Sequence, residues 1–496
     1  MKNMNSSHAT PSGQLYRSAA IAIAIAWAMR LIGLVSVLIL ARTLTPADFG
    51  VFALAMVTLA IVDIFSALGL RKALLRVPDP DRSYYDTVWT IQLILLAFLA
   101  FVLVALGPVM ASFYQEPALA WIIAILASRF LFYGLANIGI VDFERNLELG
   151  RDLKMRLVVR LTSFVLTVAA ALILRNYWAL VIGAVLQGAL HCIASYIFHP
   201  FRPRFSFRRR AEMLGPSLWM FLAAAAQTLH SEMERFVVGR IGSFGTTGFY
   251  SVSRDLSSIF THDIATALNR VTFVTTAQTG TALGQAPLRL QSMLGTYALL
   301  AAPLGLGLAA TAENAVHVLL GKQWLGAAPF LQLIAPASAA YAVFKLIISC
   351  LQASGRARFA AFLAMGAAFL AAAAIAVAVL LGAKPLEVAA VALATVAFSL
   401  IAAIAILALA ERIGMAGLMF ATARPFLAAG VMLLAIRLLG PWTGSPLFAL
   451  CTAAATGAIT YAATTTLLWL ITGRPPGAEA NALTLFTTQW RRLRGV

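Results

Sequence analysis

Six polar side chains recur at helical spacing within one expected membrane-spanning segment, residues 249–272. Consecutive members are three or four residues apart, so an α-helix places all six on one face. Such a face does not tolerate lipid, and the pattern therefore predicts the lining of a water-filled cavity. A polar seam between two packed helices is the alternative. The six are Ser251, Asp255, Ser258, His262, Thr266 and Asn269.

Charged side chains also interrupt other apolar segments, at Arg30, Asp63, Arg129 and Lys345. An ionisable group near the bilayer centre costs several kcal/mol unless it is paired or hydrated, so each marks a candidate functional position. Arg30 precedes Arg42, at the end of its segment, by 12 residues. That separation puts it about 18 Å deeper along a helix.

The basic members of this set point to an anionic cargo. A guanidinium binds phosphate oxygens in a bidentate manner, which makes a pyrophosphate the natural ligand. We predict that substrate is bound by Arg30, Arg129, Arg254 and Lys345. For Arg254 a local ion pair with a neighbouring acid is an equal alternative.

Carboxylates in the same segments have two interpretations of equal weight. Asp63, Asp255 and Asp263 could carry a coupling proton or cation, because buried carboxyls have a raised proton affinity. They could instead neutralise the arginines. The full set expected to line the cavity or to couple transport is Asp63, Gln227, Glu234, Ser251, Asp255, Ser258, His262 and Asp263.

We predict no catalytic residues, metal site or cofactor. The acidic pairs Asp79-Pro-Asp81 and Glu232-Met-Glu234 resemble an element of metal-dependent glycosyltransferases, but no nucleotide-binding domain surrounds either. No glycine-rich phosphate loop, catalytic triad or metal-ligand spacing occurs. The three cysteines fall inside apolar segments without paired spacing.

Composition places the chain in a membrane. Of its 496 residues, 61% are hydrophobic and only 11% charged, whereas soluble domains carry about 25% charged residues. The net charge of +18 comes from short clusters between apolar segments, as the positive-inside rule describes. Nucleic acid is therefore not an expected partner.

Segments of about 20 apolar residues, the length that crosses a bilayer, recur fourteen times along the chain. They predict an all-α polytopic membrane protein. The expected spans are 18–41, 49–70, 88–112, 118–141, 157–174, 178–198, 214–239, 249–272, 289–311, 327–352, 359–382, 386–410, 423–439 and 447–471.

The positive charges orient these spans. With a cytoplasmic N-terminus, the inside connections hold 24 Lys and Arg residues and the outside connections 5, while 8 lie within spans. This bias predicts a multi-pass protein of the bacterial inner membrane with both termini in the cytoplasm.

The chain also contains an internal repeat. Residues 40–50 and 238–248 align without a gap, and Arg42, Thr45 and Gly50 match Arg240, Ser243 and Gly248. Six spans separate the copies, so the repeat is parallel and predicts two six-helix lobes related by a pseudo-twofold axis. The expected divisions are a cytoplasmic segment 1–17, an N-lobe 18–200, a C-lobe 201–412, two further helices in 413–473 and a basic cytoplasmic tail 474–496.

Five short sequences give the chain a resemblance to the polysaccharide transporter family of the multidrug/oligosaccharidyl-lipid/polysaccharide exporter superfamily. They are Pro46–Gly50 after Arg42, His199–Phe207, Glu234–Arg240 with Gly248–Tyr250, Leu319–Trp324 with Ala328 and Pro329, and Leu351–Arg356. The resemblance implies two lobes around a central cavity, alternating access, and an undecaprenyl-pyrophosphate-linked oligosaccharide as cargo. It also implies that Arg30 and Arg254, matched by helix only, contact the pyrophosphate.

The expected function is thus a flippase that moves a polyprenyl-pyrophosphate-linked oligosaccharide across the inner membrane for exopolysaccharide, capsule or O-antigen assembly. Candidate partners besides the substrate are membrane lipids and polysaccharide polymerase or export machinery. Three alternatives stay open at this point: a drug/cation antiporter of the same superfamily, a flippase for a lipid-linked peptidoglycan precursor, and a polysaccharide polymerase or ligase. The last would need a large outer loop, and the outside connections are short.

Overall fold

The computed structural model describes residues 11–67, 70–146, 148–213, 218–263, 286–440 and 445–473. The chain forms two compact units. Unit 1 comprises Met1–Leu44 and Val62–Pro216, and unit 2 comprises Thr45–Ile61 and Ser217–Val496. Every regular element among the described residues is a helix, which confirms the predicted all-α class.

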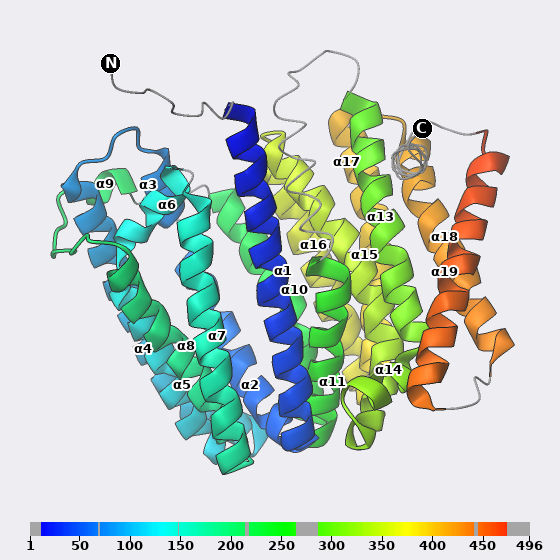
Figure 1. Cartoon of the computed structure of the whole chain (residues 1–496), viewed down its shortest axis with the longest axis horizontal. Helices are drawn as coiled ribbons and strands as arrows, with labels where there is room; N and C mark the ends of the chain where they lie inside the picture. The colour runs from blue at the N-terminus through cyan, green and yellow to red at the C-terminus, as the bar shows by residue number, and fades with distance from the viewer. Residues whose placement is uncertain are drawn as a thin grey trace, which may run out of the picture. The chain divides into compact units, whose positions relative to one another are not determined.

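Each expected span overlaps a helix among the described residues, while the number of membrane-crossing helices stays a prediction; Figure 1 shows these helices. In unit 1 they are α1 (Pro11–Thr43), α4 (Arg82–Tyr114), α5 (Ala118–Leu135), α7 (Leu149–Leu174) and α8 (Trp178–Phe198). Most of α2 (Pro46–Asp63) belongs to unit 2, together with α10 (Leu218–Ile241), α11 (Phe244–Ser258), α13 (Ala286–Ala310), α15 (Ala328–Ala353), α16 (Ala357–Leu380), α17 (Pro385–Glu411), α18 (Met415–Leu439) and α19 (Pro446–Ile471).

Short helices connect the long ones. Unit 1 contains α3 (Leu70–Arg76), α6 (Val141–Arg145) and α9 (Arg210–Met213), and unit 2 contains α14 (Ala312–Leu319). Among the described residues, eleven helices are long and apolar enough to cross a membrane. The long helices α1, α10 and α11 are not among the eleven, and α10 alone carries Glu232, Glu234, Arg235 and Arg240.

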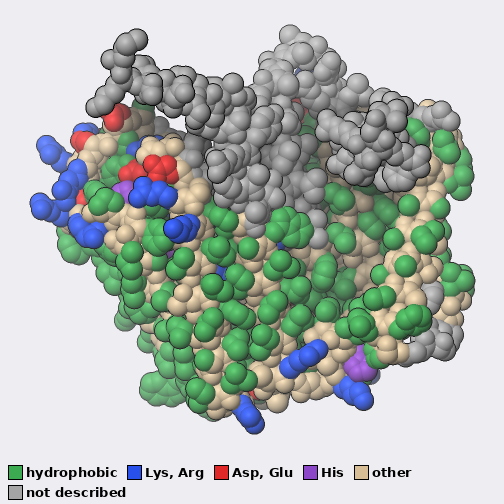
Figure 2. Space-filling view, in the orientation of Figure 1, with side chains coloured by type: hydrophobic (Ala, Val, Ile, Leu, Met, Phe, Trp, Pro, Cys, Tyr) green, Lys and Arg blue, Asp and Glu red, His purple; other side chains and the backbone are tan. Residues whose placement is uncertain are grey.

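Apolar side chains cover the flanks of the long helices of unit 1, as a lipid-facing surface requires. Phe101, Trp121 and Ile173 are examples, each at least 70% exposed. Lys and Arg side chains gather instead at the end of unit 1 where α3, α6 and α9 lie (Figure 2). The chain is therefore a multi-pass membrane protein.

The two copies of the repeat begin their helices in the same way. Thr45 accepts a hydrogen bond from the backbone N–H of Asp48 at 3.3 Å, and Ser243 accepts one from Thr246 at 3.1 Å. A hydroxyl at this position satisfies a free N–H in the first turn. Matching residues of the repeat therefore start α2 and α11.

A reciprocal crossing then brings the starts of α2 and α11 together within unit 2. A Cβ on Gly50 would lie 1.8 Å from the carbonyl oxygen of Phe244, and a Cβ on Gly248 would lie 1.8 Å from that of Pro46. Phe244 matches Pro46 in the repeat. Each copy thus presents the same glycine to the same position of the other, which is the pattern of a twofold contact.

The last two helices share a core with the rest of unit 2. Met432 and Ile436 of α18 and Ala453 of α19 pack with Ala302 of α13 and Ala429. Because α18 is part of this core, unit 2 extends beyond the expected C-lobe boundary, and it also takes in residues 45–61. The division into two six-helix lobes stays a prediction.

Candidate functional site

A buried cluster of ionisable side chains connects α10 to α11. The Tyr250 hydroxyl donates a hydrogen bond to the Glu234 carboxylate, and Arg254 Nη1 lies 3.3 Å from Glu234 Oε2 and 3.4 Å from the Tyr250 oxygen. Tyr250 is 0% exposed and Glu234 8%. The charge of Arg254 is therefore balanced locally, which is the second of the two interpretations that the sequence left open.

A second ion pair lies on the same two helices. Arg235 contacts Asp255 of α11 and, at 3.6 Å, Glu232 on its own helix. The Asp255 side chain is 54% exposed, whereas that of Arg235 is 13% exposed. Together the two pairs place three carboxylates against two guanidinium groups.

Next to the cluster, an aromatic side chain of α15 contacts residues of α10. His230 stacks on Tyr341 with ring centroids 4.9 Å apart, and Lys345 lies 5.8 Å from the centre of the same Tyr341 ring. The Tyr341 hydroxyl donates to the backbone carbonyl of Gln227 at 3.3 Å. The predicted residues Gln227 and Lys345 therefore lie beside one aromatic group of unit 2.

The structure describes only part of the predicted polar stripe on α11, and the described residues differ in exposure. Ser251 is 4% exposed, while Asp255 is exposed and Ser258 lies between these limits. A π-helical turn, Ile259–Asp263, follows Ser258 and contains His262 and Asp263, so the helical spacing changes at these two residues. Their side chains lie outside the described part of the structure. Thr266 and Asn269 also lie outside the described residues.

In unit 1 the remaining predicted residues occupy separate helices. Arg30 lies on α1, 5.7 Å from the centre of the Trp27 ring. Arg129 of α5 lies 5.4 Å from the centre of the Tyr133 ring. Asp63, at the end of α2, is exposed and accepts a hydrogen bond from Ser66 at 2.6 Å.

The structure adds one basic residue that the sequence patterns did not single out. Arg160 of α7 points at α1, where its Nη2 atom lies 3.0 Å from the position that a Cβ on Gly33 would take. It follows Asp152 and Arg156 at steps of four residues on one helix face. That spacing was the signal available in the sequence.

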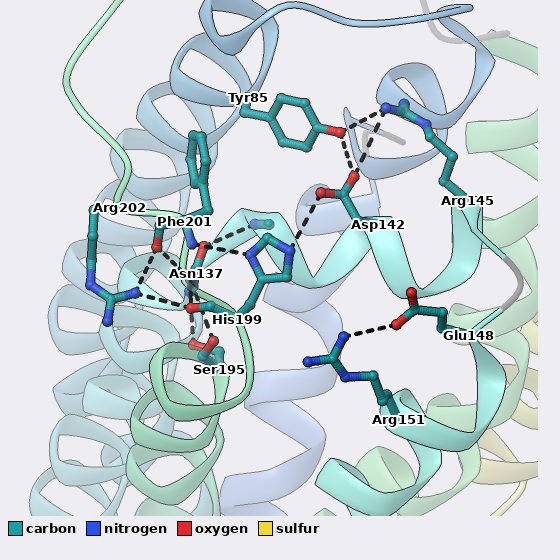
Figure 3. A network of polar contacts seen from close by, with 11 residues as sticks. Tyr85, Asn137, Asp142, Arg145, Glu148, Arg151, Ser195, His199, Phe201 and Arg202 are labelled. Atoms are coloured by element: carbon teal, nitrogen blue, oxygen red, sulfur yellow. Dashed lines mark hydrogen bonds and ion pairs between the residues drawn. The ribbon is translucent and has the colours of Figure 1, made fainter. Parts of the chain in front are cut away.

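A polar network at one end of unit 1 fixes the connection after α8 (Figure 3). The Asn137 side chain donates to the backbone carbonyls of His199 and Phe201 at 3.1 and 2.7 Å, and its backbone N–H donates to Ser195 at 2.8 Å. Asn137 is fully buried. One amide thereby joins the end of α5 to the end of α8.

The same network contains a titratable centre. Asp142 accepts a hydrogen bond from the Tyr85 hydroxyl and lies 3.4 Å from His199 Nε2 and 3.9 Å from Arg145 Nη1 (Figure 3). Burial lowers the pKa of His199, and the nearby Asp142 carboxylate opposes this only in part. His199 is therefore neutral around pH 7.

The segment that follows lies along α4. The Arg204 and Ser206 backbone N–H groups donate to Asp86 and Thr90 at 2.8 and 2.9 Å. These bonds connect the basic sequence after His199, one of the family-like motifs, to the first turns of α4. These contacts hold the segment against α4.

Among the described residues, no three His, Cys, Asp or Glu side chains are placed to hold a metal ion. Cys192 and Cys350 are free thiols on α8 and α15, and Cys451 lies on α19.

Three curated proteins are similar in sequence. An uncharacterized membrane protein in the cps region of Klebsiella pneumoniae is 24% identical over 330 residues, 66% of this chain and 68% of that protein. The succinoglycan biosynthesis transport protein ExoT of Rhizobium meliloti is 25% identical over 61% of both chains. The lipopolysaccharide biosynthesis protein WzxC of Escherichia coli is 22% identical over 66% of this chain and 67% of its own length.

Solved structures share the fold. The lipid II flippase MurJ in an inward closed conformation superposes with a TM-score of 0.69 over 90% of this chain and 98% of MurJ, at 13% identity. An inward-facing multidrug resistance MATE transporter of the MOP superfamily gives 0.51 over 85% and 99%, at 14% identity. Residues 39–329, more than half of the chain, match the model of the polysaccharide biosynthesis protein family, and the chain belongs to that family.

Proposed function

We propose that this protein is a flippase that carries a polyprenyl-pyrophosphate-linked oligosaccharide across the bacterial inner membrane for assembly of a surface polysaccharide. Membership of the polysaccharide biosynthesis protein family and the MurJ-like fold support this class of transport. The named relatives serve succinoglycan and lipopolysaccharide biosynthesis. The product of this chain is one of the same general kind: exopolysaccharide, capsule or O-antigen.

One observation favours an anionic lipid headgroup over a cationic drug. Each of α1, α5 and α7 carries an arginine well inside its apolar stretch, at Arg30, Arg129 and Arg160. Neither α1 nor α5 contains Asp or Glu, and the acid of α7, Asp152, is paired with Arg156 at 2.8 Å. Arginine is the side chain that matches phosphate geometry, and it repels a cationic drug.

In the proposed cycle these arginines hold the pyrophosphate while the polyprenyl chain stays in lipid. The parallel repeat supplies two related halves, and rocking of one against the other would open the site to alternate sides of the membrane. Lys345 and Arg254 remain candidates for substrate contact. The ion pair with Glu234 makes Arg254 the weaker of the two, because its charge is already neutralised.

The coupling of transport to a proton or cation also remains a proposal. The α10–α11 cluster has three carboxylates and two arginines, an excess of one negative charge, and Asp255 is its exposed member. An excess carboxylate with access to water could exchange a proton during a cycle. Glu234 is the buried alternative, and the residues Asp63 and Asp263 complete the set.

The drug/cation antiporter is the rival that the MATE fold supports, and the lipid-linked peptidoglycan precursor flippase is the rival that the MurJ fold supports. Deletion of the gene distinguishes them. We expect surface polysaccharide to disappear and lipid-linked repeat units to accumulate, with a plasmid copy restoring both. Greater drug sensitivity with normal polysaccharide would favour the antiporter. Arrested peptidoglycan synthesis would favour the third function.

The proposed orientation places both termini in the cytoplasm, together with the basic segment of unit 1 that contains Arg202, Arg204 and Arg209. Cysteine labelling with a membrane-impermeant reagent tests this assignment. A cysteine placed at Arg204 should be labelled in inverted membrane vesicles and protected in intact cells.

A further inference from the structure

Residues 199–210, which run from the end of α8 to the first residue of α9 in unit 1, are here called the α8–α9 segment. Five of its twelve residues are arginine and three are phenylalanine. A mixture of guanidinium groups and aromatic rings is typical of chain segments that lie in the interface between a membrane and water. The segment is therefore a candidate contact with lipid.

The backbone of the α8–α9 segment is fixed along the first turns of α4. The Arg204 and Ser206 N–H groups donate hydrogen bonds to Asp86 and Thr90 at 2.8 and 2.9 Å. Thr90 is 0% exposed. Because the backbone is already ordered, a ligand of the arginines would restrict only their side chains, which lowers the entropy lost on binding.

The depth of the segment follows from these contacts. Helix α4 has 33 residues and is about 50 Å long, which exceeds the hydrocarbon thickness of about 30 Å. Its predicted apolar span begins at residue 88, between Asp86 and Thr90. At the end of α8, Ile193 and Ile197 are 55% and 74% exposed, as lipid-facing residues are. The segment therefore lies where headgroups meet acyl chains.

Two aromatic side chains of the segment are exposed. Phe205 is 70% exposed and Phe207 is 50% exposed. The Phe205 ring centre lies 5.2 Å from that of Trp89 on α4, which is itself buried. Two exposed rings are unfavourable in water, whereas at the membrane interface they can be buried among lipid chains.

Ion pairs on this surface involve two arginines. Arg82, in the first turn of α4, lies 3.4 Å from Asp86. Arg209 lies 3.0 Å from Glu212 and 3.6 Å from Asp81. These three acids are therefore balanced by arginines that do not include the exposed ones of the segment.

The other four arginines of the segment have no acid partner. Within the part of the chain that the structure describes, Arg202, Arg204, Arg208 and Arg210 form no ion pair, and all four are exposed. The loop before α4 adds one further acid, Asp79. The surface thus keeps an excess of positive charge beside its exposed rings.

We propose that the α8–α9 segment is a binding surface for the anionic phospholipids of the membrane. Arg204 and Arg208 bind lipid phosphates, which match the guanidinium fork, and Phe205 and Phe207 enter the acyl region. Anionic lipids attract basic segments next to a membrane span. The rings and the depth favour lipid over an acidic protein. The inference concerns bulk lipid and does not depend on the cargo.

The first test measures the Kd of dioleoylphosphatidylglycerol and dioleoylphosphatidylcholine for the full-length protein in detergent, by native mass spectrometry. A basic residue near a membrane surface contributes a preference of about fivefold for anionic lipid. The double variant Arg204→Gln with Arg208→Gln should therefore bind phosphatidylglycerol about thirtyfold more weakly and phosphatidylcholine as before. A wild-type protein without preference for phosphatidylglycerol would overturn the inference.

The matched control removes two exposed charges outside the segment, by Arg175→Gln with Lys322→Gln. It should retain the preference for phosphatidylglycerol. Equal losses in the two double variants would show a general attraction between charges and would overturn the assigned surface. Displacement of phosphatidylglycerol by equimolar farnesyl diphosphate would assign the surface to a polyprenyl headgroup and would also overturn it. Elution from a size-exclusion column confirms that each variant is folded.

The second test identifies the neighbour of the segment in living cells. A photoreactive p-benzoylphenylalanine replaces Phe207, and mass spectrometry analyses the irradiated protein. We expect a phospholipid adduct, as from the same replacement at Phe101, which is 71% exposed in the middle of α4. An adduct with a protein at position 207 alone would overturn the lipid assignment. Failure of either test would leave the flippase proposal intact.

Discussion

Two arginine sites within the apolar helices, one in each unit, differ in their partners. In unit 2, Arg254 and Arg235 lie within ion-pair distance of Glu234, Glu232 and Asp255. In unit 1, Arg160 has no such partner among the described residues, and it faces a helix without Asp or Glu. A buried charge that is compensated serves the fold, whereas an uncompensated one must be hydrated or wait for a ligand. From this comparison we propose a structural role for the arginines of unit 2 and substrate binding for Arg160.

The largest expected effect is on the compensated region. Glu234→Ala leaves Arg254 buried without its carboxylate and should lower the free energy of unfolding by about 3–5 kcal/mol, the range for breaking a buried ion pair. The measurement is denaturation in detergent, monitored by intrinsic fluorescence. Glu148→Ala is the control because it breaks an exposed pair with Arg151, for which less than about 1 kcal/mol is expected. Equal losses in both variants would contradict the assignment.

A second prediction concerns stabilisation by ligand. At a concentration 100 times its Kd, farnesyl diphosphate should stabilise the wild-type protein by about 2.7 kcal/mol. Arg160→Ala should abolish most of this gain while changing the stability of the free protein little, because no partner is left unpaired. Thermal unfolding with and without the compound measures both quantities. If farnesyl diphosphate stabilised Arg160→Ala as much as the wild-type protein, Arg160 would not be a binding residue.

Substitution of two glycines, Gly248 in unit 2 and Gly33 in unit 1, should have a smaller effect on stability. A Cβ at Gly248 would lie 1.8 Å from a backbone oxygen, whereas a Cβ at Gly33 would meet only the end of a flexible side chain at 3.0 Å. Gly248→Ala should therefore destabilise the protein by about 1–3 kcal/mol, as overpacking does, and Gly33→Ala by less. Gly50→Ala should match Gly248→Ala because the crossing is reciprocal. A mild effect at Gly248 would show that α2 and α11 are free to separate.

The smallest expected effect is the pH dependence of stability that His199 causes, within the network of Figure 3. Burial lowers the pKa of His199 in the folded protein, so the folded state favours the neutral imidazole. Its contribution is present above the unfolded pKa of about 6.5 and is lost progressively as the pH falls below that value and through the lower pKa of the folded state. The wild-type protein should lose more thermal stability between pH 8 and pH 5 than His199→Gln does. Equal losses would exclude this residue as a source of the acid sensitivity.

Much of the helical architecture follows from composition and spacing. The apolar segments of the expected length overlap helices, and at Trp178–Phe198 the expected and observed bounds are the same. The repeat was visible because Thr45 and Gly50 recur as Ser243 and Gly248. Sequence cannot show that these glycines cross each other, since that depends on packing between helices far apart in the chain.

The site was harder to predict for a definite physical reason. Periodicity assigns a face to a residue but not its partner. Ser251 and Asp255 fall on one ideal stripe, yet Ser251 is buried and Asp255 pairs with Arg235 from α10. The π-turn after Ser258 then alters the spacing itself. Arg160 was missed because its significance comes from what the facing helix lacks, a side chain at Gly33 and any carboxylate.

Transport selectivity for the phosphate group tests the account most directly. Proteoliposomes containing the full chain would receive a polyprenyl-linked oligosaccharide joined through either a diphosphate or a monophosphate, and accessibility to a membrane-impermeant glycosidase would report translocation. We predict that the wild-type protein moves the diphosphate form at least tenfold faster, as expected for a further charge-assisted contact, and that Arg160→Lys loses most of this preference. Equal rates for the two substrates in the wild-type protein would contradict the account.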